Sequence, residues 1–428
     1  MTSRSEWSTG RHTLVVSLLL YGVVVLPAAA APLTLEQAWQ LAEAANPALQ
    51  TARANLAAAE EQLTDARALL WNNPELSVEG ARREVPQIGL DNERRREWNT
   101  GISQTFEIAG QQGYRREAAT QELAALQSTL QETRRQVRAE VEQQYVRVLA
   151  LQLRIATEGQ ALELFEDAAA VVRKRVAAGE DSRLDGNLAV VEAERGRNQL
   201  AALREQLIEA RADLARALQM APGNLPEAAG ELTPVVANYT LEQLLDSAAN
   251  RPQPRTLEFR EAAARSRLDL ERASVYPDIT VGISTGREGP GEAREKVVGL
   301  SVSVPLPLFR RNATGIGKAI TELTQARIER QAASRDVPAQ VRAQWLKVES
   351  LRTRVKRFED TVLARLDDNQ RLSAKAYGAG ELGVLQLIVV NRQLLDGRRD
   401  LLDAQSELRL ATIALEAAAG WPTGGYGK

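Results

Sequence analysis

The sequence of 428 residues contains 44% hydrophobic and 26% charged residues but only 4% aromatic residues, a composition that suits long helices. Its 54 Lys and Arg residues nearly balance its 56 Asp and Glu residues, so the one-sided basic surface of a nucleic-acid binder is absent and nucleic acid is excluded as a partner. Cysteine is absent, which excludes disulfide bonds, thiol catalysis and zinc-thiolate sites and leaves no acceptor for an N-terminal lipid anchor.

Residues 1–30 have the pattern of a secretory signal peptide. Arg4 and Arg11 precede an apolar run from Leu14 to Leu26, and small residues follow it. This run is too short to span a bilayer. Signal peptidase does not cleave directly before a proline, so Pro32 rules out a cut after Ala31 and we predict cleavage after Ala30. The pattern of the segment predicts export by the Sec route.

The first half of the mature chain predicts a helix, two strands and two further helices. Apolar residues recur at three- and four-residue spacing in three segments, which run from about Leu35 to Leu70, from Gln112 to Ala178 and from Leu184 to Leu218. Apolar and polar residues alternate at 75–85 and 97–108, as in strands joined by a polar loop. At 1.5 Å per residue the middle helix could reach about 100 Å and the others roughly 50 Å. Two short helices stacked end to end would therefore match one long helix.

The second half repeats this order beyond a linker marked by Pro222 and Pro234. Helical spacing returns in three segments, from about Tyr239 to Val275, from Arg310 to Tyr377 and from Val384 to Ala418. Pro338 is the one interruption of the long segment. Strand alternation returns at 278–287 and 297–308. On their own, the helices also fit an ordinary coiled coil or a helical bundle.

Short sequence matches about 200 residues apart indicate that the two halves are copies of one unit. The sequence TLEQ at 34–37 returns at 240–243, and the sequence AGE at 178–180 returns at 379–381. We therefore divide the chain into a signal peptide (1–30), a first structural repeat (31–236) and a second structural repeat (237–428).

Each predicted strand has one apolar and one polar face over about ten residues, the length that a tilted strand needs to cross an outer membrane. No later segment approaches the ~18 uninterrupted apolar residues of a membrane helix, so any crossing must use strands. Four strands are too few to close a barrel, and an open sheet edge is not tolerated in lipid. Several chains must therefore share one barrel, and three chains would supply twelve strands. A soluble sheet with its apolar face on a core is the alternative.

Four aromatic residues lie near the ends of the predicted strands: Trp71, Trp98, Tyr276 and Phe309. An aromatic girdle at the membrane boundaries would have this placement. Packing within a protein core is the alternative for each of them.

Together these motifs resemble the outer-membrane factor family, the TolC-like efflux ducts. The resemblance covers both halves through the Pro-Glu/Asp-x-x-Val strand starts at 74–78 and 277–281, Phe309 after the fourth strand and the two Ala-Gly-Glu turns. The segment SQTFEIAG at 103–110, leading to Arg115 and Ala118, is most similar to the CzcC-like heavy-metal branch.

This resemblance implies a mainly helical trimer with a twelve-stranded β-barrel in the outer membrane and a twelve-helix tunnel through the periplasm. It implies as partners a periplasmic adaptor, or membrane-fusion protein, and a proton-driven inner-membrane pump of the resistance-nodulation-division (RND) type. The duct itself would hydrolyse nothing and would need no cofactor.

The resemblance also implies that the two helix-to-helix turns dock the adaptor and close the resting tunnel. The expected docking residues are Gly179, Glu180, Asp181, Ser182, Gly378, Gly380, Glu381, Leu382 and Gly383. In relatives an aspartate six residues after the turn glycine contributes to the gate, and Asp185 and Gln386 occupy this place here. The gate and pore candidates are therefore Asp185, Glu381, Gln386 and Glu180, since acidic side chains repeated three times form a cation-attracting ring. Plain turns with solvated charges are the alternative.

We accordingly predict a passive exit duct of a tripartite RND-type efflux system that exports heavy-metal cations. The only histidine, His12, lies in the signal peptide, and Met220 is the only methionine beyond it, so a resident metal site is not expected. A duct for drugs or other organic compounds is one alternative. A periplasmic adaptor is another, although adaptors carry one helical hairpin where this chain has two. An enzyme would have to rely on carboxylates alone, because phosphate-loop and nucleophile-elbow motifs are absent.

Overall fold

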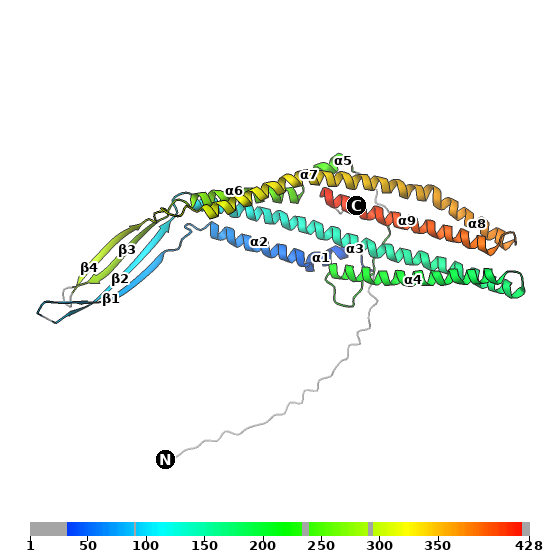
Figure 1. Cartoon of the computed structure of the whole chain (residues 1–428), viewed down its shortest axis with the longest axis horizontal. Helices are drawn as coiled ribbons and strands as arrows, with labels where there is room; N and C mark the ends of the chain where they lie inside the picture. The colour runs from blue at the N-terminus through cyan, green and yellow to red at the C-terminus, as the bar shows by residue number, and fades with distance from the viewer. Residues whose placement is uncertain (1–31, 90, 233–238, 290–293, 422–428) are drawn as a thin grey trace, which may run out of the picture.

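The computed structural model describes residues 32–89, 91–232, 239–289 and 294–421. The predicted signal peptide, residues 1–30, lies outside these ranges. Within them the chain forms a long helical body, and a four-stranded antiparallel sheet projects from one end of that body (Figure 1). Two helical hairpins form the opposite end.

The first half of the chain is built around one very long helix. The helix α3 (Gln111–Ala178) contains 68 residues and is therefore about 100 Å long. Along it pack α2 (Pro47–Ala66), on the half nearer to the sheet, and α4 (Arg183–Ala217), on the other half (Figure 1). The short helix α1 (Leu35–Ala45) lies between α2 and α4.

The second half repeats this arrangement with α5 (Leu241–Ala249), α6 (Pro252–Ala273), α7 (Ala313–Arg357), α8 (Ala364–Gly378) and α9 (Val384–Ala419). A π-helical turn at Phe358–Leu363 joins α7 to α8 without a break in the helix, and Pro338 lies inside α7 without ending it. The helix α6 packs against α7 near the sheet, and α9 packs against α7 and α8 toward the far end.

Two segments predicted as continuous helices are each broken by a proline. The segment predicted at 35–70 divides into α1 and α2 because Asn46 is extended and Pro47 begins the second helix. In the second half, extended Arg251 precedes Pro252 and separates α5 from α6 in the same way. The proline ring disfavours helical backbone at the residue before it, so proline starts a new helix here.

The sheet contains β1 (Glu75–Val85), β2 (Glu93–Phe106), β3 (Ile279–Glu288) and β4 (Glu295–Ser303), which pair antiparallel in chain order. The start of β2 is predicted at about residue 97, but the strand begins four residues earlier, at Glu93. The β1–β2 ladder continues outward, with Arg94 bonded to Glu84 at 2.9 Å. Such cross-strand pairs of opposite charge stabilise a hairpin, although a run of charges resembles a loop in sequence.

The strand β4 is shorter than predicted. It ends at Ser303 rather than at residue 308. Pro305 and Pro307 lack the amide hydrogen that a strand ladder requires, so the apolar alternation continues in sequence after the pairing has stopped.

The hydrophobic core lies between the helices. One buried cluster joins α3 to α1, α4 and α9, and a second joins α7 to α5 and α9. The helix α9 therefore connects the two halves of the chain. At this connection Glu142 on α3 binds Arg409 on α9 at 2.5 Å, with both side chains nearly excluded from solvent.

Glu416 on α9 is a second buried carboxylate beside this ion pair. Burial and the nearby charge of Glu142 raise the pKa of Glu416 to about 7, against the opposing effects of Arg409 and of a hydrogen bond from Tyr239. Because the folded-state pKa lies above the ordinary value, the folded protein holds the proton more tightly than the unfolded chain. This contribution to stability is complete below about pH 4.5 and is lost as the pH rises to about 7.

We expect Glu416→Gln to remove this pH dependence. The variant should unfold at a higher temperature than the parent protein at about pH 8 and at a similar temperature near pH 5. The separation of the two pKa values corresponds to roughly 3 kcal/mol per chain as an upper limit. Thermal unfolding of the purified protein measured across this pH range checks the prediction, with the exposed Glu407→Gln on the same helix as control. Parallel pH profiles for the parent protein and Glu416→Gln would contradict it.

Candidate functional site at the helical tips

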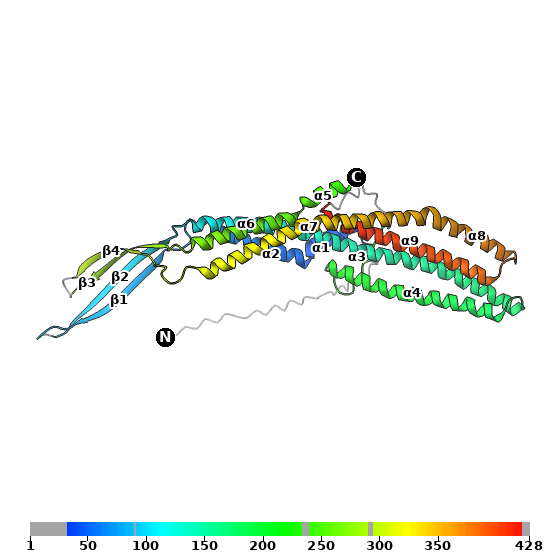
Figure 2. The same ribbon diagram turned by 45° about the horizontal axis from the view of Figure 1, so that its top comes forward.

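The two helical hairpins turn at the end of the molecule farthest from the sheet (Figure 2). Both turns use the same backbone geometry. Gly179 and Gly380 have φ values of 80° and 78°, a left-handed conformation that glycine adopts without strain. The amide of the glutamate that follows each glycine, Glu180 or Glu381, donates to a carbonyl of the preceding helix at 2.9 or 3.0 Å. The two turns are therefore matched structures from two distant parts of the sequence.

The helices that leave the two turns are capped differently. Ser182 and Asp185 form a reciprocal capping box at the start of α4, and Asp185 Oδ2 accepts a hydrogen bond from the Ser182 hydroxyl at 2.7 Å. At the start of α9 the corresponding residues are Gly383, which offers no side-chain cap, and exposed Gln386. Asp185 thus caps the start of α4. The sequence alone did not show whether Asp185 had this structural role or a role in the gate.

The acidic residues of the tips differ in how their charges are balanced. Asp181 lies 3.1 Å from Arg175, and exposed Glu180 lies 3.5 Å from the same guanidinium. Glu381 is exposed and forms no ion pair with any residue that the structure describes. Among the predicted acidic candidates, Glu381 therefore presents the least compensated charge.

The two hairpins pack against each other behind their turns. Phe165 and Val172 on α3 and Ile388 on α9 belong to one buried cluster, which Tyr377 at the end of α8 also contacts. The Arg175 guanidinium lies 5.5 Å from the centre of the Tyr377 ring. The tips of the two halves are thus held as one unit, and Arg175 contacts both of them.

An ion-pair network ties the hairpins together further from the turns. Glu158 on α3 is 2% exposed and binds both Arg154, at 3.1 Å, and Arg399 on α9. A cavity of about 400 Å³ lies next to it and is lined by α3, α4 and α9. Glu158 was not predicted as a site residue, since nothing in the local sequence pattern separates it from the exposed glutamates of the same helix.

Two exposed leucines occupy matching positions just beyond the turns. Leu184 is 67% exposed on α4, and Leu385 is 48% exposed on α9. Of the remaining predicted docking residues, Gly378 is exposed and Leu382 is partly buried. Each exposed leucine follows its turn glycine at the same spacing, so the repeat is visible in the sequence, although neither leucine was among the predicted docking residues.

The sheet is the second candidate region, and its two faces differ in character. One cross-strand row on the apolar face consists of Leu76, Ile102, Ile283 and Leu300, all more than half exposed. The neighbouring row on the polar face consists of Ser77, Gly101, Ser284 and Gly299. The apolar face is not covered by the helical body, from which the sheet projects (Figure 1).

All four predicted girdle aromatics are exposed around this sheet. Trp98 lies on the apolar face toward the outer end, and Tyr276 and Phe309 lie near the helical end, with Phe309 96% exposed. Trp71 is half exposed at the junction of sheet and helices, where the Arg115 guanidinium covers its ring at 3.9 Å. Its contact with Arg115 was not foreseen from the sequence.

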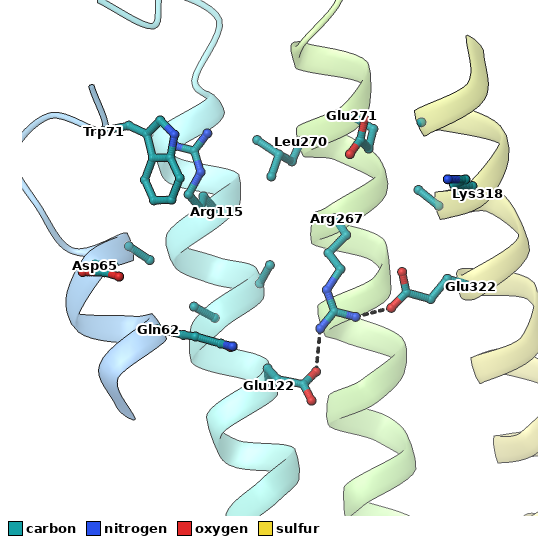
Figure 3. Close-up of a pocket in the computed structure, with 15 residues that line it drawn as sticks. Gln62, Asp65, Trp71, Arg115, Glu122, Arg267, Leu270, Glu271, Lys318 and Glu322 are labelled. Carbon is teal, nitrogen blue, oxygen red and sulfur yellow. Dashed lines mark hydrogen bonds and ion pairs between the residues drawn. The ribbon is translucent and has the colours of Figure 1, made fainter. Parts of the chain in front are cut away.

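A pocket of about 450 Å³ lies at this junction, between α2, α3, α6 and α7 (Figure 3). Arg267 on α6 reaches across it and pairs with Glu122 on α3, at 2.6 Å, and with Glu322 on α7. The two ion pairs of Arg267 thus link three helices, α3, α6 and α7, below the sheet.

The segment at 103–110 connects the sheet to α3. Gly110 has a φ of 80° where the chain turns into the helix. Beyond the turn, Arg115 binds Glu107 through two nitrogen–oxygen contacts, of 2.6 and 2.9 Å. The residues that carried the resemblance to the heavy-metal branch thus have a structural role in joining sheet and helix.

Comparison with known proteins now places the chain in a family. Residues 38–219 and 244–421 match the sequence profile described as "Outer membrane efflux protein". The chain belongs to this family. The two matched segments follow the two halves of the fold, and the resemblance predicted from the motifs is confirmed.

Named relatives of this efflux protein include two metal-resistance proteins. The cobalt-zinc-cadmium resistance protein CzcC of Cupriavidus metallidurans is 27% identical over 380 residues, which cover 86% of each chain. The nickel-cobalt-cadmium resistance protein NccC of Alcaligenes xylosoxydans xylosoxydans is 27% identical over 344 residues, covering 77% of this chain and 74% of the relative.

The outer membrane protein VceC of Vibrio cholerae has a similar solved structure. It superposes with a TM-score of 0.74 at 19% identity, over 90% of this chain and 96% of VceC. The predicted fold class, mainly helical with four antiparallel strands per chain, is therefore confirmed.

Within the ranges that the structure describes, no helix combines the length and the apolar character needed to cross a membrane. No group of three or more His, Asp or Glu side chains in the same ranges is arranged to hold a metal ion.

Proposed function

We propose that three copies of this efflux protein form a passive exit duct in the bacterial outer membrane. Their twelve strands close one barrel, and their helices continue it as a tunnel through the periplasm. The duct receives its substrate from a proton-driven inner-membrane RND pump through a periplasmic adaptor. It carries out no chemical step and uses no cofactor, and the signal peptide directs its export.

The sheet is the observation that carries this proposal. Its apolar face is exposed, and the outer edges of its two edge strands, β1 and β4, pair with no other strand among the described residues. In water this arrangement would expose an apolar surface and two unpaired strand edges, which favour aggregation. Membrane lipid would cover the face, and sister chains would pair the edges. The small polar residues of the other face would then line the barrel.

The tips support the assignment of an adaptor-docking end. Exposed Leu184 and Leu385 beside the two glycine turns give this end of the tunnel apolar contact points on an otherwise charged surface. A docked adaptor would remove these two side chains from water. We assign adaptor docking to the two turns, 179–182 and 378–383, together with these leucines.

The names of the relatives support divalent heavy-metal cations as the exported substrate. A threefold ring of Glu381 would attract such cations to the tunnel entrance. Deletion of the gene followed by growth on cobalt, zinc, cadmium, nickel and lipophilic drugs tests this assignment. Sensitivity to drugs alone would overturn the metal substrate and leave the duct intact. A protein absent from the outer-membrane fraction, or one that never runs as a heat-modifiable trimer, would overturn the duct itself.

Charge reversal at Glu381 should change ion selectivity. We expect Glu381→Lys to lower the cation-to-anion permeability ratio of the trimer several-fold, because three carboxylates in the ring become three ammonium groups. Reversal potentials in planar bilayers under a potassium chloride gradient measure this ratio.

The matched control is Glu180→Lys at the equivalent position of the other turn. The Glu180 carboxylate already lies 3.5 Å from Arg175, so its reversal should have the smaller effect. An unchanged conductance and permeability ratio in Glu381→Lys would remove Glu381 from the pore.

A further inference from the structure

The outer end of the sheet carries a basic cluster on its apolar face. Arg82 and Arg96 lie directly opposite each other in the β1–β2 ladder. In the preceding row of the same face, Trp98 pairs with Arg287, which in turn pairs with Lys296. Paired residues of neighbouring strands project from the same face, so these four cations surround Trp98. We refer to Arg82, Arg96, Arg287 and Lys296 as the basic cluster.

The basic cluster has no counter-charge within the described part of the chain. All four of its side chains are exposed, and none forms an ion pair there. The nearest acid on this face of the β1–β2 hairpin, Glu84, is bonded to Arg94 at 2.9 Å. Like charges placed directly opposite each other destabilise a hairpin, so the Arg82–Arg96 pair calls for an anion from outside the chain.

The polar face of the same hairpin shows the contrast. There Arg83 binds Glu97 at 3.3 Å and Arg95 binds Glu93 at 2.9 Å, so each cation has an acid partner. Arg83 and Arg95 on the polar face are therefore paired within the chain, whereas Arg82 and Arg96 on the apolar face are not.

The height of the cluster matches a membrane boundary. From Phe106 at the helical end to Trp98, β2 rises roughly 26 Å along the strand at about 3.3 Å per residue. For a strand tilted by about 40° this corresponds to about 20 Å along the membrane normal, close to the height of the apolar band of an outer-membrane barrel. Trp98 thus falls at the outer boundary, and the arginine pair lies one row beyond it, at the level of the lipid head groups.

We propose that the basic cluster binds the phosphate groups of the phosphorylated glycolipid in the outer leaflet. Guanidinium groups bind phosphate through two parallel hydrogen bonds, and two opposed arginines offer a site for one phosphate. The neighbouring chain of the trimer would place its own edge strand beside Arg82. The proposal rests on the proposed function, because it requires the sheet to lie in the outer membrane.

The test uses the purified full-length trimer in detergent. Lipid A bearing both phosphates and enzymatically dephosphorylated lipid A are titrated against it, and retained lipid is measured by native mass spectrometry. We expect the phosphorylated form to bind at least about ten-fold more tightly, and we expect the double variant Arg82→Gln/Arg96→Gln to lose that preference. The matched control, Arg83→Gln/Arg95→Gln, removes two arginines from the polar face and should retain it.

Equal affinity of the parent protein for the two lipids would overturn the proposal and would assign the basic cluster to another anion, such as an acidic protein. This comparison needs no variant, so it holds even if the double variant fails to assemble. A trimer that resides in the outer membrane but binds both forms of lipid A with equal affinity would refute only this inference. A chain that never enters the outer membrane would refute the proposed function as well.

Discussion

Replacing Leu300 with arginine is expected to abolish assembly of this efflux protein in the outer membrane. Leu300 lies in the central row of the apolar face, opposite Ile283, and is 74% exposed. An arginine at the midplane of the bilayer costs about 2–4 kcal/mol on the lipid face of a barrel. Three chains repeat this cost in one trimer. Immunoblotting of outer-membrane fractions without heating measures the surviving trimer.

The control for this experiment is the adjacent position on the same strand. Ser301 is exposed on the opposite, polar face, so Ser301→Arg should allow assembly and should change conductance instead. If both variants assemble equally well, the apolar face does not contact lipid. If neither variant assembles, Leu300→Ala separates loss of packing from insertion of charge.

Replacing Glu158 with glutamine is expected to lower the free energy of unfolding by about 3 kcal/mol. The side chain is buried between Arg154 and Arg399, and breaking a buried ion pair by removing one partner costs about 3–5 kcal/mol. The lower end of this range applies because each arginine keeps another carboxylate, Asp403 at 2.7 Å and Asp396 at 2.9 Å respectively. The apparent midpoint of thermal unfolding of the purified trimer measures the loss.

Glu163 provides the comparison for Glu158. It lies on the same helix and is exposed, so Glu163→Gln should leave the midpoint nearly unchanged. A Glu158→Gln variant as stable as Glu163→Gln would mean that the contact between α3 and α9 contributes little to holding the hairpins together.

Periodicity in the sequence predicted the elements of this fold better than their ends. The two faces of the strands and the long helix α3 follow from residue spacing alone, because burial repeats with the geometry of each element. The breaks at Pro47 and Pro252 were missed because each proline begins a helix whose spacing continues that of the helix before it. The early end of β4 was missed because alternation describes side chains, whereas Pro305 and Pro307 act on the backbone ladder.

The candidate site was predicted only in part for a similar reason. The repeated glycines identified both turns, since a left-handed residue leaves a local mark in the sequence. The partners of the acidic residues left no such mark. Arg175 reaches Asp181 across the turn itself, but it contacts Tyr377 only after the two hairpins have packed. The sequence alone therefore does not show which acidic residue lacks an ion-pair partner and is suited to a gate.

The two matched turns have a consequence for any assembly built on them. Three chains with two turns each would present six binding sites, of two kinds in alternation, around the tunnel mouth. At three of them the helix after the turn begins with the Ser182–Asp185 capping box, and at the other three it begins with Gly383 and Gln386. A ring of six identical partner subunits would therefore meet two chemically distinct kinds of binding site. Each subunit would bind one kind more tightly than the other.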